Sequence, residues 1–338
     1  MGSVESPARK QGPMRFLLRL FDAALFLTVI GFGGFTLTLL LARLHWVLDN
    51  ATGFEFVFFL VSLPLVIVAA IRRMRITGAI AGVLAIYHAM LVAPFYIGSP
   101  PDAIKRLKGF RVMSANLQWD SKDPERVYKI INQEAPDILA LQEVTPSRLP
   151  ELERLRDNYP YWTHYAEASV LGVALLSKFP ITEEKRRWIT KGVYPTVIAT
   201  LDINGTPLHI AITHTVPPFS SDWVKERDAQ LTTLQKELIG IPGNRLVVGD
   251  LNATMWTPSY RDFVHAAGLQ NARKGHGVVP TYKFRGIPMV PIDHILTRGN
   301  VVVQDCRAGP EMGSDHRPLI VDIAYFDDVR EPTHISDN

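Results

Sequence analysis

Three long apolar stretches near the start of the chain limit what it can fold into. They cover residues 23–42, 54–71 and 76–97, and the first carries no charged side chain. A helix needs about 20 predominantly apolar residues to cross the hydrocarbon core of a bilayer. A buried soluble helical domain is the alternative, but it rarely contains three stretches of this length. We therefore predict a transmembrane helical region at residues 23–98, with about three crossings.

Basic residues around these stretches predict how the region is oriented. Four Lys or Arg residues precede the first stretch and three lie between the second and third, whereas Arg43 alone lies between the first and second. Short flanks rich in Lys and Arg stay in the cytoplasm. We therefore expect residues 1–22 to be cytoplasmic and everything after about Gly98 to lie on the other side. The predicted location is the inner (plasma) membrane, multi-pass, with the soluble part periplasmic or extracellular.

The rest of the chain alternates between short apolar runs and amphipathic runs. We expect a linker at residues 99–109, a domain at 110–326 and a C-terminal tail at 327–338. Strands in pairs, with helices between some of them, predict two sheets packed face to face and covered by helices. The expected strands are near 110–116, 137–141, 172–177, 195–203, 207–213, 245–250, 292–297, 301–306 and 318–325, and the expected helices are 123–135, 146–156, 222–239 and 258–267.

Charge and cysteine content narrow what this soluble part can do. Residues 100–338 hold 28 Lys and Arg against 29 Asp and Glu, so the part is close to neutral. A domain that grips nucleic acid without sequence preference usually has a clear basic excess. The single cysteine, Cys306, excludes an intrachain disulfide and is expected to be a small core residue.

The run Val247-Val248-Gly249-Asp250-Leu251-Asn252 joins a buried strand to two polar side chains. Residues two apart in a strand share one face, so Asp250 and Asn252 can project together from the strand end. A carboxylate beside an amide suits the holding of a metal-bound or water nucleophile near a phosphate. An Asp-x-Asn sequence after a strand is also a common turn, in which the side chains cap the backbone.

Several other predicted strands begin or end in a polar residue that can bind a metal or move a proton. Each alone fits a turn or a cap, but side chains at matching strand ends converge on one rim of a sheet sandwich. Among them, Glu143 is the natural ligand for a hard cation such as Mg²⁺, because such cations prefer carboxylate oxygens. Asp293 and His316 could form a carboxylate–imidazole pair. The full set is Asn116, Glu143, His214, Asp250, Asn252, Asp293, Asp315 and His316.

Five motifs in this order resemble the endonuclease/exonuclease/phosphatase superfamily, which has the deoxyribonuclease-I-like fold. They are Ser114-Ala115-Asn116-Leu117, Leu141-Gln142-Glu143-Val144, Gly249-Asp250-Leu251-Asn252, Ile292-Asp293-His294-Ile295-Leu296 and Ser314-Asp315-His316-Arg317-Pro318. With its apolar N-terminal helices, the chain is similar to a membrane-anchored bacterial branch. The resemblance implies an α/β fold, a four-layer α/β sandwich with two mostly antiparallel sheets, preceded here by about three transmembrane helices. It also implies metal-dependent cleavage of a phosphoester by water.

The resemblance further implies a role for each residue at the rim. Glu143 would bind the metal with Asn116 beside it, and Asp315 would complete the metal site. Asp250 would orient or deprotonate the attacking water, Asn252 would hold the phosphate or that water, and His214 would lie against the phosphate. His316 would contact the scissile phosphate and be held in place by Asp293. Whether Asp250 or His316 is the base stays open.

Other residues near the motifs have two interpretations each. Arg227 either supports the site or lies on a solvated helix face. Trp256 and Tyr260 either line a substrate groove or pack in the core. His294 should point away from the site and be structural, whereas Thr281-Tyr282 resembles a Thr and an aromatic residue that family members place nearby.

These residues predict a membrane-anchored, divalent-metal-dependent phosphodiesterase. Mg²⁺ is the expected cofactor, with Mn²⁺ or Ca²⁺ as alternatives. The resemblance favours a nuclease. The alternative is a phospholipid or small-phosphoester hydrolase, sphingomyelinase-like or inositol-phosphatase-like, which the membrane helices and the neutral charge favour. The expected partners are thus a phosphoester substrate, nucleic acid or phospholipid, and the membrane. A non-enzymatic scaffold is a third reading, against which the intact carboxylates and histidines argue.

Overall fold

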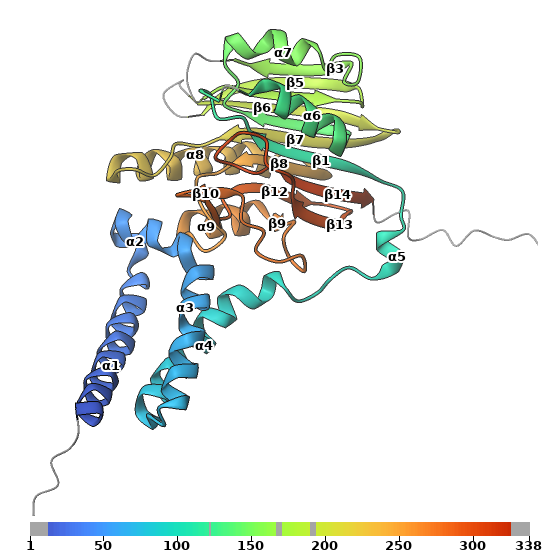
Figure 1. Cartoon of the computed structure of the whole chain (residues 1–338). Helices are drawn as coiled ribbons and strands as arrows, with labels where there is room; N and C mark the ends of the chain where they lie inside the picture. Colours follow the sequence, from blue (N-terminus) through green and yellow to red (C-terminus); the bar gives the residue numbers. More distant parts are fainter. Residues whose placement is uncertain (1–12, 122, 167–170, 190–193, 326–338) are drawn as a thin grey trace, which may run out of the picture.

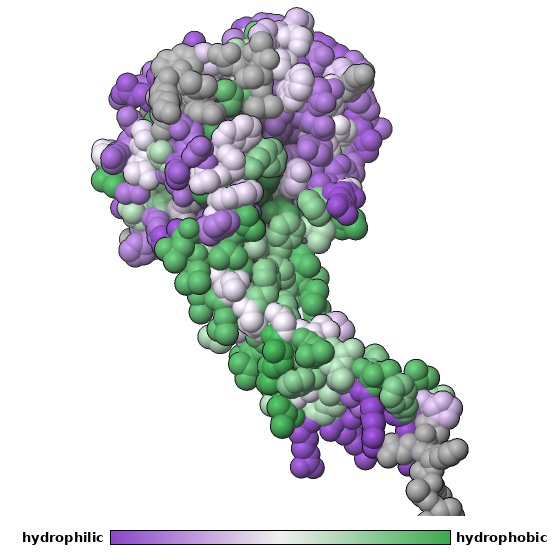
Figure 2. Space-filling model, turned by 90° about the vertical axis from the view of Figure 1, so that its left-hand side faces the viewer, coloured by the Kyte–Doolittle hydropathy of each residue, from purple (hydrophilic) through white to green (hydrophobic). Residues whose placement is uncertain are grey.

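A computed structural model describes residues 13–121, 123–166, 171–189 and 194–325 of the chain. A helical stem leads into a larger head built of sheets and helices (Figure 1). The stem consists of α1 (Pro13–Leu39), α3 (Glu55–Ile71) and α4 (Arg75–Val92), which with their short extensions are long and apolar enough to cross a membrane. Figure 2 shows this stem as mostly hydrophobic, and hydrophilic colour returns at its far end.

Two helix boundaries differ from the predicted ones, and the linker contains a helix that was not predicted. α1 begins at Pro13 and not at residue 23, since the charged residues before the apolar stretch are also helical. One of them, Asp22, accepts a hydrogen bond from Nε of Arg72 at the α3–α4 turn, at 2.8 Å. The third apolar stretch leaves the α-helix at Val92 and continues as a 3₁₀ turn that contains Pro94. The linker contains a short helix, α5 (Asp102–Lys105). The predicted tail at 327–338 and residues 1–12 lie outside the described residues.

The connection between the first two long helices of the stem packs on the head. This connection, residues 42–54, contains α2 (Trp46–Ala51) between two 3₁₀ turns, η1 (Ala42–Leu44) and η2 (Thr52–Phe54). Arg43 Nη1 lies 2.6 Å from Oδ2 of Asp262, and Nδ2 of Asn50 donates to the carbonyl of Pro218 at 2.6 Å. The connection and the head therefore lie at the same end of the stem, as three crossings require.

The head contains two six-stranded sheets and a hairpin (Figure 1). Each large sheet is mixed and mostly antiparallel, with a single parallel pair, β1–β2 in the first and β7–β8 in the second. The first sheet has β13 (Val301–Ala308), β14 (Leu319–Tyr325), β1 (Gly109–Asn116), β2 (Ile138–Gln142), β4 (Val173–Ser177) and β3 (Tyr161–Tyr165) in that order. The second has β5 (Ile181–Ile189), β6 (Tyr194–Ile203), β7 (Thr206–His214), β8 (Asn244–Asp250), β12 (Asp293–Arg298) and β9 (Gln270–Asn271). The hairpin is β10 (Tyr282–Phe284) with β11 (Ile287–Val290).

Helices cover the outer faces, so the predicted four-layer sandwich is confirmed. α6 (Pro124–Glu134) and α7 (Leu149–Glu153) pack on the first sheet, and α8 (Ser221–Ile239) and α9 (Pro258–Ala267) pack on the second. The helix expected at 146–156 is shorter, because Pro146–Arg148 forms a 3₁₀ turn, η4, before α7.

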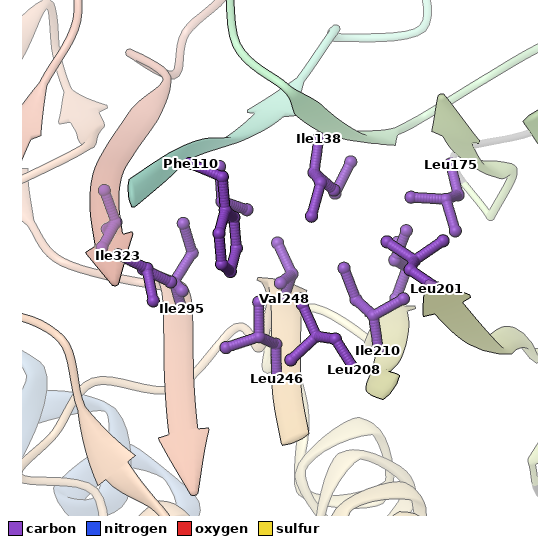
Figure 3. Packing of buried hydrophobic residues seen from close by; sticks show 14 of the residues in the cluster. Phe110, Ile138, Leu175, Leu201, Leu208, Ile210, Leu246, Val248, Ile295 and Ile323 are labelled. Carbon is purple, nitrogen blue, oxygen red and sulfur yellow. The ribbon is translucent and has the colours of Figure 1, made fainter. Parts of the chain in front are cut away.

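Alternate residues of facing strands fill the space between the two sheets. Ile138 and Leu175 from the first sheet and Leu208, Ile210 and Val248 from the second point toward one another (Figure 3). Each such fully buried side chain contributes about 1.5–3 kcal/mol relative to an exposed one. Cys306 is buried in the same cluster, as predicted. This rigid core fixes the strand ends that carry the polar residues.

Candidate active site

Strand register brings the predicted residues of both sheets to one rim. Along the parallel pair β7–β8, His214 lies opposite Asp250, and along the antiparallel pair β8–β12, Asp250 lies opposite Asp293. On the first sheet, Asn116 at the end of β1 lies opposite Gln142, and Glu143 follows directly. The structure therefore brings together side chains that are far apart in the sequence.

Glycine at position 249 allows β7 and β8 to lie close together at this rim. Gly249 has φ of 146°, and a Cβ placed on it would lie 1.9 Å from the carbonyl oxygen of Thr213. Two site residues also adopt positive φ without being glycine, Glu143 at 60° and Asn252 at 45°. Such conformations cost free energy in non-glycine residues and are concentrated at functional sites.

Asp250 lies at the centre of the cluster. Its Oδ2 is 3.6 Å from Nε2 of His214, 3.7 Å from Nε2 of His316 and 3.2 Å from Nδ2 of Asn116. The backbone N–H of Asn252 donates to its Oδ1 at 2.8 Å. Burial, together with the nearby charge of Asp293, raises the pKa of Asp250 to about 6, although the two histidines oppose the shift.

Asp293 and His316 form the predicted pair. Nδ1 of His316 donates to Oδ2 of Asp293 at 2.8 Å, and both side chains are buried. Burial alone would lower the pKa of His316, but the carboxylate of Asp293 and this hydrogen bond raise it to about 10. Burial likewise raises the pKa of Asp293, and the charge and hydrogen bond of His316 outweigh it, so the net shift is downward. The imidazole is thus held in its charged form.

The predicted metal residues lie beside this pair. Nδ2 of Asn116 donates to Oε1 of Glu143 at 3.0 Å, and the backbone N–H of Trp119 donates to Oε2 of Glu143 at 2.8 Å. Asp315 and Glu143 line one pocket, and the backbone N–H of Asp315 donates to Oε1 of Gln118 at 2.8 Å.

A second set of side chains is also close enough together to hold a metal ion. In the described part of the chain, potential ligand atoms of Asp250, Asp293 and His316 lie within 4.8 Å of one another. Nδ1 of His316 is already hydrogen-bonded to Asp293 in this group. The carboxylates of Glu143 and Asp315 line the same pocket. Oδ1 of Asp293 is buried without a hydrogen-bond partner, so this corner can accept a further polar group.

The structure decides between the paired interpretations of the neighbouring residues. Arg227 is only 1% exposed, and its Nη1 donates to the carbonyl of Asn252 at 3.3 Å, so it supports the site. Trp256, just before α9, and Tyr260, within α9, pack in the core and do not line the pocket over the site. His294 points away, with Nε2 2.8 Å from the carbonyl of Ala253, as predicted. Thr281 and Tyr282 do lie at the site: the Thr281 hydroxyl is 3.4 Å from the backbone nitrogen of Asp293, and the Tyr282 ring centroid is 5.1 Å from that of His316.

Sequence reasoning missed two buried charged residues that position the site. Arg273 donates from Nη2 to the carbonyl of Asp293 at 2.7 Å and holds the start of β12. Asp49, in the connection between membrane helices, lies 2.8 Å from Nη2 of Arg227. Asp49 is isolated between apolar stretches in the sequence, and nothing adjacent to it indicates a partner in α8.

A pocket of about 530 Å³ opens over these residues. Its floor is polar and contains Glu143, His214, Asp250 and His316. Its walls are largely apolar and come from four separate parts of the chain. They include Phe54, Trp119, Pro217, Pro218, Phe219, Phe284, Val290 and Ile292.

A family model described as the endonuclease/exonuclease/phosphatase family matches residues 113–316, more than half of the chain. No curated protein matches the chain.

Three solved structures show a similar fold at low sequence identity. An endonuclease/exonuclease/phosphatase from Beutenbergia cavernae is 18% identical, with a TM-score of 0.55 over 65% of this chain and 72% of that one. D. rerio TDP2 complexed with a single-strand DNA product is 15% identical, with a TM-score of 0.54 over 64% of this chain and 100% of that one. The human Nocturnin catalytic domain with a bound sulfate anion is 22% identical, with a TM-score of 0.51 over 64% and 94%.

Proposed function

The chain belongs to the endonuclease/exonuclease/phosphatase family, and we propose that it is a membrane-anchored, divalent-metal-dependent phosphodiesterase. One observation carries the proposal. Oδ2 of Asp250, a carboxylate with a raised pKa, lies within 3.7 Å of two histidines and 3.2 Å from the amide of Asn116, which donates to Glu143. This arrangement offers a proton acceptor, positive charge for a phosphate and oxygen ligands for a cation within one pocket.

Glu143 and Asn116 would hold the cation, and Asp315 would complete its coordination. The Asn116 amide lies between the carboxylates of Glu143 and Asp250. The oxygen of this amide accepts a hydrogen bond from the backbone N–H of Gln118 at 2.9 Å. Half a turn of the amide would exchange that bond for a position beside the two carboxylates, which gives the all-oxygen donor set that Mg²⁺, Mn²⁺ or Ca²⁺ prefers. The bound cation would supply Lewis acidity to the phosphoryl oxygen.

The remaining residues divide the proton and charge work. Asp250, whose pKa is about 6, can accept a proton from water near neutral pH. His316 is kept protonated by Asp293, so it suits the stabilisation of negative charge on the phosphate better than the role of base. Nε2 of His214 lies 3.6 Å from Oδ2 of Asp250, and the side chain lines the same pocket. The amide of Asn252, held by the carbonyl of Thr215 at 2.7 Å, would orient the water or the phosphate.

Activity on a soluble diester tests this proposal. Full-length protein purified in detergent should hydrolyse bis(p-nitrophenyl) phosphate with Mg²⁺, Mn²⁺ or Ca²⁺ and stop on chelation. Glu143→Gln should lower kcat/KM by about 100-fold or more, because a carboxylate oxygen of the cation site is lost. Glu153→Gln is the matched control, since Glu153 is an exposed glutamate at the end of α7 that pairs with Arg156. Equal turnover by the two variants at limiting cation would remove Glu143 from the metal site.

The proposed location is the inner (plasma) membrane, with the head on the periplasmic or extracellular side. The basic residues near Pro13 and at the α3–α4 turn support it, because they lie at the end of the stem away from the head. Reporter fusions after Met74 and after Gly98 should report opposite sides. A cytoplasmic signal from the fusion after Gly98 would reverse the assignment.

Nucleic acid is the first candidate substrate, and the TDP2 complex with a DNA product is the observation that favours it. A phospholipid or other small phosphoester is the second candidate, favoured by the apolar walls of the pocket.

A further inference from the structure

We propose that the substrate is a membrane lipid phosphodiester, whose phosphate binds over Asp250 while its acyl chain lies along the apolar walls of the pocket. This inference rests on the proposed function and names its substrate class. In the reaction, the oxygen of water bonds to phosphorus and one of the two P–O ester bonds breaks. The leaving alcohol takes up a proton, and the products are an alcohol and a phosphomonoester.

The membrane region itself builds one wall of the pocket. Asn50, Gly53 and Phe54, from the connection between the first two membrane helices, line it together with the catalytic floor. The ring of Phe54 meets that of Phe284 from the β10–β11 hairpin edge to face, with centroids 5.8 Å apart. A Cβ on Gly53 would lie 3.5 Å from Thr254, so this turn is packed closely on the head. The pocket is therefore continuous with the end of the membrane stem.

A buried ion pair fixes that wall to the catalytic loop. Arg227 Nη2 lies 2.8 Å from Oδ2 of Asp49, and both side chains are buried. The same guanidinium donates to the carbonyl of Asn252, two residues after Asp250. The position of the connection and the position of the catalytic strand end are thus set by one arginine.

The edge of the pocket beside the stem exposes large apolar side chains. Phe219 is 72% exposed and Phe284 is 42% exposed, and Trp223 and Ile287 are exposed as well. Phe219 and Trp223 contact each other, with ring centroids 5.9 Å apart. Exposed aromatic clusters are unfavourable in water but favourable at a bilayer interface, where ring faces contact lipid. Their place beside the stem fits a rim that lies against the membrane surface.

The charge of the pocket disfavours a nucleic acid strand. Among the described residues that line it, Arg227 is the single Lys or Arg, and Asp49 and Asp228 already pair with it. Asp120, Glu143, Asp250 and Asp315 add negative charge. A strand with a phosphate at every nucleotide needs several basic contacts. One phosphodiester at the end of an apolar chain needs only the polar floor.

The experiment compares kcat/KM of the full-length protein, in detergent with Mg²⁺, Mn²⁺ or Ca²⁺, for four substrates. These are mixed micelles of long-chain phosphatidylethanolamine and phosphatidylglycerol, short-chain dihexanoyl lipids with the same headgroups, bis(p-nitrophenyl) phosphate and a single-stranded DNA oligonucleotide. We expect kcat/KM for the long-chain lipids to exceed that for the short-chain lipids by about tenfold or more, since only the former fill the apolar walls.

Variants at the rim test where the chain binds. Phe284→Ser should lower the ratio of long-chain to short-chain kcat/KM about fivefold, and Ile287→Ser should lower it in the same direction. Tyr161→Ser is the matched control, because Tyr161 is a 39% exposed aromatic residue on β3 outside the pocket. All three side chains are exposed, so thermal unfolding should change little and will identify any variant that fails to fold.

The outcomes separate this inference from the proposed function. Cleavage of the soluble diester that depends on Glu143, with DNA preferred over lipid or with no difference between chain lengths, overturns the lipid assignment alone. No cleavage of any substrate with any of the three cations overturns the proposed function and this inference together. An unchanged chain-length ratio in both Phe284→Ser and Ile287→Ser also overturns the assignment of the apolar walls.

Discussion

Two of the buried carboxylate–imidazole pairs in the described part of the chain can be compared, one in the head and one in the stem. In the head, Nδ1 of His316 lies 2.8 Å from Asp293. In the stem, Nδ1 of His88 lies 2.7 Å from Oε2 of Glu55. The two Nδ1–carboxylate distances are nearly equal, but the surroundings of the other ring nitrogen, Nε2, differ. Nε2 of His316 faces Asp250 across the pocket at 3.7 Å, whereas Nε2 of His88 lies 3.2 Å from the hydroxyl of Thr36.

This difference separates a pair that is open to the pocket from an enclosed one. The second nitrogen of His316 is within reach of a molecule in the pocket, so its charge can act on a substrate. His88 is enclosed by Thr36 and by the ring of Phe32, whose centroid is 5.4 Å away. It joins three helices by polar contacts, which lipid-exposed surfaces cannot provide. A buried histidine beside a carboxylate is therefore not enough to identify a catalytic group.

The largest expected effect is on activity when the open pair is broken. Asp293→Asn should lower turnover by roughly 10²–10⁴-fold, the range for loss of a positioned proton-transfer or charged group, while the fold stays intact. His316→Ala should cost about the same, and the double variant little more, because the two residues act as a unit. A double-mutant cycle read in activity and in melting temperature measures this. Additive losses that appear mainly in stability would remove both residues from the site.

The same substitution in the closed pair should affect stability. His88→Ala leaves the Glu55 carboxylate buried without its partner, so we expect a loss of about 3 kcal/mol of unfolding free energy. Turnover per folded molecule should remain close to that of the unchanged protein. Thermal unfolding in detergent, paired with activity at low temperature, provides the measurement. A loss of turnover as large as that of His316→Ala would mean that the stem pair takes part in catalysis.

The third effect is on titration of the open pair in chelator-treated protein. Because Asp293 raises the pKa of His316 to about 10, this imidazole should stay protonated at neutral pH. Its contribution to stability is fully present below the ordinary histidine pKa of about 6.5 and is lost as pH rises toward 10. NMR of the histidine ring nitrogens measures the pKa directly. In Asp293→Asn the titration should move to lower pH, and an unmoved titration would show that another group holds the proton.

The smallest effect is expected at the hydroxyl that closes the stem pair. Thr36→Val keeps the shape of the side chain and removes its contact with His88. Polar contacts between membrane helices contribute about 0.6 kcal/mol on average. The melting temperature in detergent should therefore fall slightly, and activity should be unchanged. A drop comparable to that of His88→Ala would show that the hydroxyl holds the pair together.

The sequence predicted the strands that contain an apolar run, whether or not they carry a motif. The positions of β1, β2, β4, β6, β7, β8, β12, β13 and β14 were predicted within a few residues. β3 and β5 were missed, as were the short strands β9, β10 and β11. β5 contains Glu183, Glu184, Lys185, Arg186 and Arg187, so it lacks the apolar signal on which prediction depends.

The site was predicted where local motifs exist and missed where contacts are long-range. Asp293 and His316 could be paired from chemistry alone, since a histidine needs an orienting carboxylate. Asp49 and Arg227 are 178 residues apart, and each is ordinary in its own segment. Their pairing exists because the membrane connection folds back on α8, and no periodicity in either segment encodes that approach.

The attachment of the head to the stem sets the height at which it works. Polar contacts tie the two together, among them Arg43 with Asp262, Asn50 with Pro218, Asp49 with Arg227, and the indole of Trp256 with the carbonyl of Leu91 at 3.0 Å. A head on a flexible tether would sample a wide volume of solution. In the proposed membrane arrangement, these contacts would hold the pocket at one distance from the bilayer and in one orientation. Phosphates at that level would be presented to it continuously, and those farther away would be out of reach however abundant they are.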